Sequence, residues 1–180
     1  MSGTGKTTAA RRVATVLGLP FYEMDALAIG PRWSLAPDLV DQVGRITAEP
    51  AWIFDSWGYP AVRDMMWRSA DTILWLDYPA RVVLPRLIWR SAVRTATRTD
   101  VFGGNRERWR DWLSPQHPVW SAAATFAERR EYLLDRTSGS VHCQTTRFTS
   151  PREFEQWYRL LRDRARQKTW GTSPDQAVLR

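Results

Sequence analysis

The sequence predicts an α/β protein in which a mainly parallel sheet is flanked by helices. Short apolar runs alternate with amphipathic stretches along the 180 residues, which is the pattern of strand and helix units on a parallel sheet. A glycine-rich loop stands directly before the first amphipathic stretch, and several apolar runs end in an aspartate. Because ligands of open α/β sheets bind at the carboxyl ends of the strands, we expect the site at that edge.

The chain length fits one domain, which we expect over residues 1–166, followed by a frayed tail over 167–180. The first expected helix covers 7–17 and ends before Gly18 and Pro20, and a short strand over 21–24 then ends at Asp25. The other expected strands cover 51–54, 72–76 and 141–148, and the other expected helices cover 35–48, 80–98, 119–136 and 151–166. The run Ser150-Pro151-Arg152-Glu153 predicts a capping box at the start of the last helix.

The charge balance favours a phosphate-bearing partner. Basic residues outnumber acidic ones by 26 to 19, and only Lys6 and Lys168 are lysines. The planar fork of arginine suits phosphate on a nucleotide or on a nucleic-acid backbone, so the charge does not choose between these partners. A solvated basic surface would give the same excess of positive charge.

Cysteine usage and hydropathy indicate a cytoplasmic protein. Cys143 is the single cysteine, so no internal disulfide forms, and a reducing compartment is the simpler interpretation. No run approaches about 20 apolar residues, which argues against a membrane span. The glycine-rich polar start is unlike a signal peptide.

The strongest motif is the loop Ser2-Gly3-Thr4-Gly5-Lys6-Thr7-Thr8, which supplies the second half of the pattern G-x-x-x-x-G-K-[ST] directly before a helix. Glycines let successive backbone N–H groups turn toward phosphate oxygens, and the following helix N-terminus adds its positive dipole end. Lys6 would reach the β- and γ-phosphates, and the Thr7 hydroxyl would ligate Mg²⁺. The loop therefore predicts a P-loop protein that binds ATP and Mg²⁺.

The usual surroundings of this loop are incomplete in the sequence. The first glycine of the pattern would fall one position before Met1, and the strand that feeds the loop would precede that glycine. We expect the reading frame to continue upstream with about 8 apolar, β-branched residues that end in glycine. An in-frame stop codon immediately upstream would contradict this expectation.

Further segments resemble one family, the P-loop kinases of the adenylate kinase type, in particular the adenylate kinase-like proteins called topology modulation proteins. The resemblance extends from Ser2 to about Tyr158 and rests on the loop and on Met24-Asp25-Ala26-Leu27, Trp52-Ile53-Phe54-Asp55, Leu76-Asp77-Tyr78-Pro79, Gly104-Asn105-Arg106-Glu107 and Ser150-Pro151-Arg152-Glu153. It implies a P-loop NTPase fold and an enzyme that transfers the γ-phosphoryl group of ATP to a small acceptor. It also implies a helical lid at about 99–136.

The resemblance singles out two arginines on the expected helix 80–98. In adenylate kinases, arginines seven and eleven residues after the proline of an Asp-x-Pro strand end grip the ATP phosphates, and counting from Pro79 gives Arg86 and Arg90. Arg94 and Arg98 continue the same spacing of four, so all four arginines share one helix face. A solvated basic face is the alternative interpretation of this stripe.

The resemblance also separates the three strand-end aspartates by role. Asp55 matches the Walker B type aspartate that holds Mg²⁺. Asp77 competes for that role, but it precedes Pro79 and a helix start, so we interpret it as a turn or N-cap acceptor. Asp25 matches the residue that faces the phosphoryl acceptor and takes its proton, with loop capping as the alternative. The adenylate kinase signature Asp-Gly-Phe-Pro-Arg is not reproduced after Asp55, so AMP is not implied as the acceptor.

Lid and adenine contacts follow from the resemblance alone. Asn105, Arg106 and Arg129 or Arg130 would lie on the lid. The loop 147–152, with Arg147 and Arg152, would lie against adenine.

Two other functions stay open. The arginine helix and the Trp/Arg segment 106–112 could track a nucleic-acid backbone and stack bases, as in an ATP-dependent or ATP-sensing nucleic-acid-binding protein. At helical spacing the same tryptophans would instead pack on a core or lid. A non-catalytic P-loop relic is the other alternative, because the first strand is missing. His117 and His142 lack metal-site spacing, and we expect them to be packed or solvated.

Overall fold

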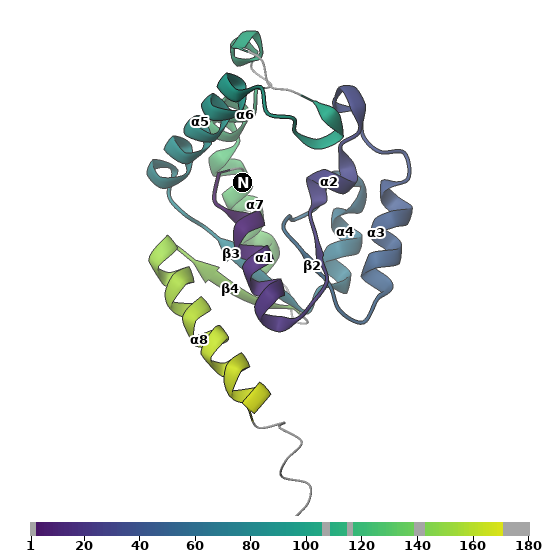
Figure 1. The fold of residues 1–180 in the computed structure, drawn as a ribbon, viewed down its shortest axis with the longest axis vertical. Helices are drawn as coiled ribbons and strands as arrows, with labels where there is room; N and C mark the ends of the chain where they lie inside the picture. Colours follow the sequence, from purple (N-terminus) through teal and green to yellow (C-terminus); the bar gives the residue numbers. More distant parts are fainter. Residues whose placement is uncertain (1–2, 106–108, 115–116, 139–142, 171–180) are drawn as a thin grey trace, which may run out of the picture.

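A computed structural model describes residues 3–105, 109–114, 117–138 and 143–170 (Figure 1). The strands are β1 (Phe21–Tyr22), β2 (Ile53–Phe54), β3 (Thr72–Leu76) and β4 (Gln144–Phe148). The α-helices are α1 (Lys6–Leu17), α2 (Met24–Ala28), α3 (Leu39–Ala48), α4 (Pro60–Ser69), α5 (Ala80–Thr97), α6 (Pro118–Ala124), α7 (Phe126–Ser138) and α8 (Pro151–Trp170). Short 3₁₀ helices are η1 (Pro31–Trp33), η2 (Phe102–Gly104) and η3 (Trp109–Leu113). The described fold is thus mixed α/β and mostly helical.

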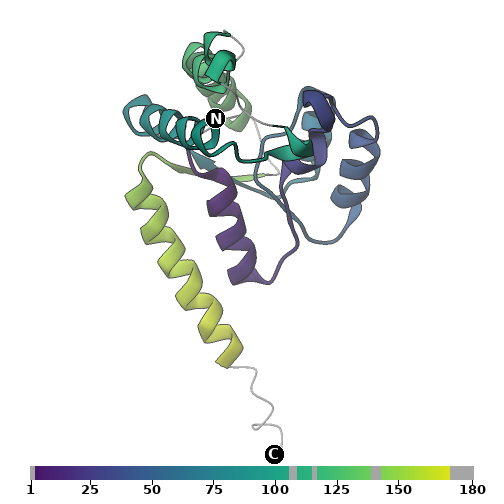
Figure 2. The same cartoon turned by 45° about the horizontal axis from the view of Figure 1, so that its top comes forward.

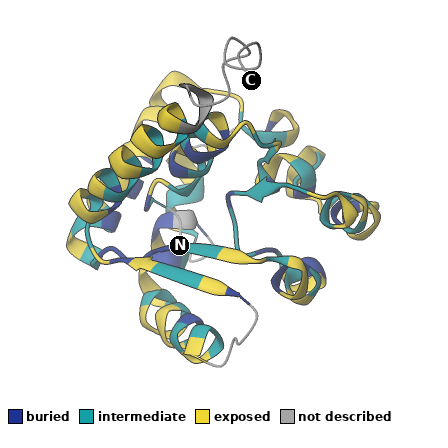
Figure 3. Cartoon of the chain, turned by 90° about the horizontal axis from the view of Figure 1, so that it is seen from below, coloured by how far each residue is buried: buried dark blue, intermediate teal, exposed yellow. Residues whose placement is uncertain are grey.

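The described strands form two separate parallel sheets, whereas the sequence predicts a single mainly parallel sheet. β1 pairs with β2, with Phe21 opposite Ile53. β3 pairs with β4 over five residues, from Thr72 opposite Gln144 to Leu76 opposite Phe148. Figure 3 shows the two pairs apart from each other.

Strand β3 packs against helices on both of its faces. Successive side chains of a strand point to opposite faces, so alternate apolar residues of β3 join different cores. Leu74 and Leu76 join a core with α1 and α8, where Phe154 and Trp157 of α8 pack. The intervening residues of β3 join Trp67 of α4 and Leu133 and Leu134 of α7. Both faces of this strand are therefore apolar, which explains its continuous apolar run in the sequence.

A second core is formed by α2, α3 and α4, and it corrects the predicted strand 21–24. Met24 and Ala28 are fully buried, and their spacing of four places them on one face of α2. The strand ends at Tyr22, because the chain from Met24 onward forms a helix that buries Met24 and Ala28 in this core. Asp25 therefore lies in the first turn of a helix instead of at the end of a strand.

Three helix boundaries differ from the expected ones. α3 begins at Leu39 instead of 35, because Pro37 disfavours helical backbone at Ala36. The expected helix 119–136 is two helices separated at Thr125. α8 continues to Trp170, past the expected limit of 166, and residues 171–180 of the predicted tail lie outside the described residues. Helix α4 was not anticipated.

The start of α8 confirms the predicted capping box. The backbone N–H of Glu153 donates to the Ser150 hydroxyl at 3.3 Å, and the Glu153 carboxylate accepts from the backbone N–H of Thr149 at 2.7 Å. The Thr149 hydroxyl also donates to this carboxylate at 2.7 Å, and this bond, together with the backbone bond from Thr149, lowers the pKa of Glu153. α8 then runs beside α1 (Figure 2), where the Arg12 guanidinium bonds both carboxylate oxygens of Glu155.

Among the described helices, none combines the length and the apolar composition that a membrane crossing requires.

Candidate functional site

The loop before α1 has the backbone that a phosphate-binding loop needs. Gly3 and Gly5 have φ of 84° and 88°, a region that side chains rarely adopt. A Cβ on Gly3 would also lie 2.9 Å from the carbonyl oxygen of Val83 on α5. Only glycine therefore lets the loop pass this close to α5, at the N-terminus of a 12-residue helix. Ser2 lies outside the described residues.

A cavity of about 190 Å³ opens at this helix N-terminus and gathers most of the predicted phosphate ligands. It is lined by Gly3, Gly5, Lys6, Thr7, Thr8, Arg86 and Arg90. The two arginines come from α5, some eighty positions along the chain, and they are the two that the count from Pro79 selects. Thr4 is buried and does not line the cavity. We call this space the cation cavity.

The pKa of Lys6 is shifted in the cation cavity. Burial lowers the pKa of its ammonium group, and the carboxylates of Asp55 and Asp25 raise it again, while Arg90 lowers it further. A cation held beside other cations is stabilised by an anion in the cavity. The lining of the cation cavity therefore favours an anion.

Asp55 lies against the loop and has the surroundings expected of a Mg²⁺ ligand. It follows β2, and its carboxylate accepts the Thr7 hydroxyl at 2.5 Å and the Met24 backbone N–H at 3.0 Å. Mg²⁺ prefers oxygen ligands and is commonly held by one or two carboxylates together with substrate phosphates and waters. The hydroxyl of Thr7 and the carboxylate of Asp55 fit this set. No cluster of three or more metal-type side chains occurs among the described residues.

Asp25 lies near this site but outside the cation cavity, on the exposed side of α2. The Tyr59 hydroxyl donates to its carboxylate at 3.0 Å. Burial, together with the Asp25 charge, raises the pKa of Tyr59, so this hydroxyl stays protonated. Asp25 also raises the pKa of Lys6, which places its charge within range of the loop.

Sequence reasoning missed Glu23, which adds a third carboxylate to this region. Burial raises the pKa of Glu23, and the charges of Asp55 and Asp25 raise it further, while Arg11 and Arg94 lower it. The Glu23 carboxylate lies 3.5 Å from the Arg11 guanidinium. Its position next to Met24 in the matched segment was the signal that could have pointed to it.

Asp77 is structural, but in a different way from the predicted turn or N-cap role. Its side chain is 1% exposed and binds two arginines, with Arg130 Nε at 2.9 Å and Arg147 Nε also at 2.9 Å. No side chain caps α5. The aspartate therefore ties β3 to α7 and β4, far apart in the sequence.

The structure places three residues that the resemblance assigned to the lid or to adenine: Arg130, Arg147 and Arg152. Arg147 lies on β4 and above the Trp75 ring, so the expected loop 147–152 is wrong at its start. The contact of Arg147 with adenine stays a prediction. In this structure the Arg147 guanidinium is bound to Asp77. Arg130 is likewise bound there, and Arg152 lies exposed in the first turn of α8.

The expected lid packs against the rest of the chain in this structure. The Asn105 amide donates to the Gly30 carbonyl at 2.9 Å, and its oxygen accepts the Trp33 N–H at 3.1 Å. His117 is buried and stacked on Trp112, as expected of a packed histidine. Arg106 and His142 lie outside the described residues. Trp109 is exposed, so the Trp/Arg segment is divided between packed and solvent-facing rings.

Comparisons of the chain with known protein families, with curated proteins and with solved structures found no match.

Asp77→Asn should lower the free energy of unfolding by about 2 to 3 kcal/mol. Removing one partner of a buried ion pair usually costs more, but Arg130 and Arg147 are 46% and 36% exposed and keep some hydration. Urea unfolding measures the loss. ATP binding should change little in the folded variant. A large loss of ATP binding with unchanged stability would instead indicate that Asp77 holds Mg²⁺.

Proposed function

We propose that this chain binds ATP with Mg²⁺ and transfers the γ-phosphoryl group to a small acceptor, as an adenylate kinase-like P-loop enzyme. The observation that carries the proposal is the convergence of Lys6, Arg86 and Arg90 on one cavity at the N-terminus of α1. These residues were selected by the motif and by the count from Pro79. Their meeting in space supports a triphosphate ligand more strongly than their abundance in the sequence does.

Catalysis in such a site consists of positioning and neutralisation of charge. The acceptor oxygen attacks the γ-phosphorus, the bond to the β,γ-bridging oxygen breaks, and ADP leaves with that oxygen. The acceptor hydroxyl gives its proton to the Asp25 carboxylate, which the Tyr59 hydroxyl holds in place. Lys6, Arg86 and Arg90 bind the phosphate oxygens. Thr7 and Asp55 would hold Mg²⁺, which supplies further neutralisation of phosphate charge when bound.

Transfer of label from γ-labelled ATP tests the proposal directly. The chain is incubated with Mg²⁺ and a panel of nucleotides, nucleosides and small alcohols, and the products are separated. A labelled small product is expected with at least one class of acceptor. If ATP binds but every acceptor stays unlabelled, phosphoryl transfer is contradicted. If duplex DNA or RNA binds with a steep salt dependence and no product forms, the nucleic-acid alternative is favoured instead.

Arg86→Ala and Arg90→Ala should each lower phosphoryl transfer by about ten-fold to a hundred-fold, while Arg98→Ala should leave it nearly unchanged. Only the first two line the cation cavity, and charge-assisted bonds to phosphate are worth about 1.5 to 3 kcal/mol each. Arg98 is the control because it lies exposed at the C-cap of α5, one residue past the helix end, and does not line the cation cavity. Equal small effects at all three positions would show that the stripe is a solvated face.

A further inference from the structure

The outward face of α5 is apolar, which is the reverse of the polarity that a surface helix normally has. The inner face of the helix is buried and contains two polar residues, Ser91 and Thr95. The outward face exposes three large apolar side chains, with Ile88 43%, Trp89 73% and Val93 39% exposed. With smaller apolar residues at spacings of three and four, they form what we call the α5 apolar face: Pro85, Ile88, Trp89, Ala92, Val93 and Ala96. An exposed apolar patch of this kind marks an interaction site.

A row of arginines borders the α5 apolar face. Helix α5 and the two residues that follow it contain five arginines and neither aspartate nor glutamate. Four of these arginines recur at every fourth position, from Arg86 to Arg98. Arg86 precedes Trp89 by three positions, and Arg90 precedes Val93 by three, so the row lies directly beside the apolar face. The helix therefore presents positive charge along one side of an exposed apolar stripe.

The segments beside α5 carry further exposed apolar side chains. In Figure 1 α5 lies at the edge of the molecule, with α6 next to it. The Trp112 indole of η3 donates to the Thr95 hydroxyl at 3.1 Å, which holds η3 against the inner face of α5. Leu113 of η3 and Trp120 of α6 are both exposed. Exposed apolar side chains therefore occur on η3 and α6 as well as on α5.

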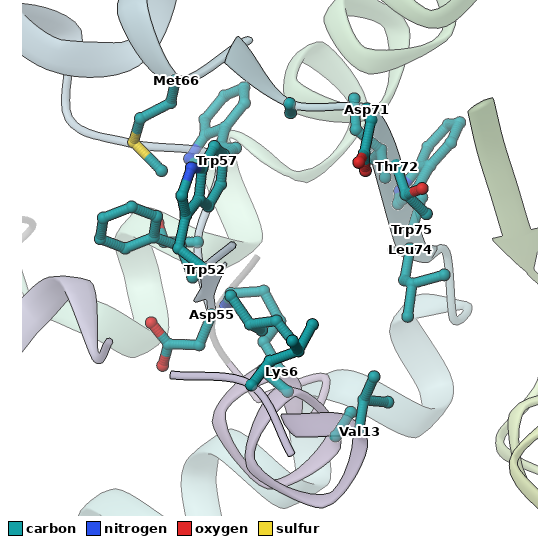
Figure 4. A pocket seen from close by; sticks show the side chains of 18 of the residues that line it. Lys6, Val13, Trp52, Asp55, Trp57, Met66, Asp71, Thr72, Leu74 and Trp75 are labelled. Carbon is teal, nitrogen blue, oxygen red and sulfur yellow. The ribbon is translucent and has the colours of Figure 1, made fainter. Parts of the chain in front are cut away.

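The α5 apolar face is separate from the cavities described for this chain. A cavity of about 640 Å³, larger than the cation cavity, is bounded by β2 and β3 (Figure 4), and none of its described lining residues belongs to α5. The cation cavity is lined by Arg86 and Arg90 of α5 but by none of the apolar-face residues. The proposed nucleotide site therefore does not account for the exposure of this face.

We propose that the α5 apolar face docks on an anionic lipid surface, with Trp89 at the level of the headgroups and the arginine row on the lipid phosphates. Tryptophan is enriched at membrane–water interfaces, where helices that lie in the surface bury an apolar face and basic residues are attracted by anionic lipids. Both parts of this chemistry are present on α5, because the apolar stripe and the arginine row run side by side.

Two other occupants fit the face less well. A second copy of the chain would bring two arginine rows together in an isologous contact, and α5 has no acidic residue to pair with them. A single-stranded nucleic acid stacks its bases on aromatic rings, whereas Ile88 and Val93 offer aliphatic side chains on either side of Trp89. The mixture of aliphatic side chains, tryptophan and arginine therefore favours lipid.

Sedimentation of the chain with vesicles tests the proposal. The chain should bind vesicles of equal parts phosphatidylcholine and phosphatidylglycerol, and it should bind vesicles of phosphatidylcholine alone much more weakly. Raised salt should weaken the binding because it screens the charges. Trp89→Gln should weaken binding to the anionic vesicles by about ten-fold, because it removes the largest side chain of the face. Arg98→Ala should weaken it by about five-fold.

Trp33→Gln is the matched control, because Trp33 is an exposed tryptophan on η1, outside α5. This variant should bind vesicles as the unchanged chain does. Equal binding to the two kinds of vesicle, or equal losses in Trp89→Gln and Trp33→Gln, would overturn the proposal. Self-association or nucleic-acid binding that depends on Trp89, without vesicle binding, would also overturn it. None of these readouts depends on ATP, so they are independent of the proposed enzyme activity.

Discussion

Lys6→Met should abolish phosphoryl transfer and weaken ATP binding by on the order of 3 kcal/mol or more, a factor above 100. The Lys6 ammonium lines the cation cavity together with Arg86 and Arg90, so its charge would act directly on the phosphates. Methionine keeps an unbranched apolar side chain of similar length at this position and removes the charge. Isothermal titration with ATP and a turnover assay measure the two losses.

The same substitution should not destabilise the fold. Burial lowers the pKa of Lys6, which means that protonation of this lysine is less favourable in the folded chain than in the unfolded one. At neutral pH the protonated lysine therefore contributes no stability that methionine would lose, and the thermal midpoint should stay equal or rise slightly. Lys6→Ala should give the same loss of transfer. Near-normal turnover in either variant would contradict the role of Lys6.

Asp55→Asn should reduce transfer by about 10² to 10³, or roughly 3 to 4 kcal/mol in the transition state, and should raise the Mg²⁺ concentration needed for half-maximal activity. The amide oxygen can still accept the Met24 N–H, and the Thr7 hydroxyl can accept from the amide nitrogen, so the local structure is preserved. The lost property is the negative charge that a divalent cation requires. Activity as a function of Mg²⁺ concentration measures the effect.

The matched comparison for this variant is Asp77→Asn. Both aspartates follow a strand, but Asp77 is bound to Arg130 and Arg147, while Asp55 is bound to the loop residue Thr7. We expect activity to fall at Asp55 with little change in stability, and stability to fall at Asp77 with little change in activity. An unchanged Mg²⁺ requirement in Asp55→Asn would show that Asp55 does not hold the metal.

The parts of the site that follow from local chemistry could be predicted from the sequence. The glycines of the loop, the strand 72–76 and the N-terminus of α5 depend on short-range patterns, and the structure confirms their positions. The spacing from Pro79 then placed Arg86 and Arg90 one turn apart on a single helix face. Their approach to Lys6 required only that α5 lie beside the loop, which Gly3 permits by its lack of a side chain.

The parts that were missed depend on contacts between distant segments. Arg147 and Arg130 meet at Asp77 across 70 and 53 positions of sequence, and no local pattern encodes that meeting. Helix α2 is only five residues long and is held by the burial of Met24 and Ala28 against α3 and α4. The division into two sheets could not be read from strand propensity either, because it depends on which strands pair in space.

The most direct test of the central claim is a competition titration, in which ATP with Mg²⁺ is bound to the chain and then displaced. If Lys6, Arg86 and Arg90 form a triphosphate site, ATP should bind with one-to-one stoichiometry, and inorganic tripolyphosphate should displace it far more effectively than adenosine does. Absence of ATP binding, or displacement by adenosine but not by tripolyphosphate, would contradict a phosphate-binding loop at residues 3–7.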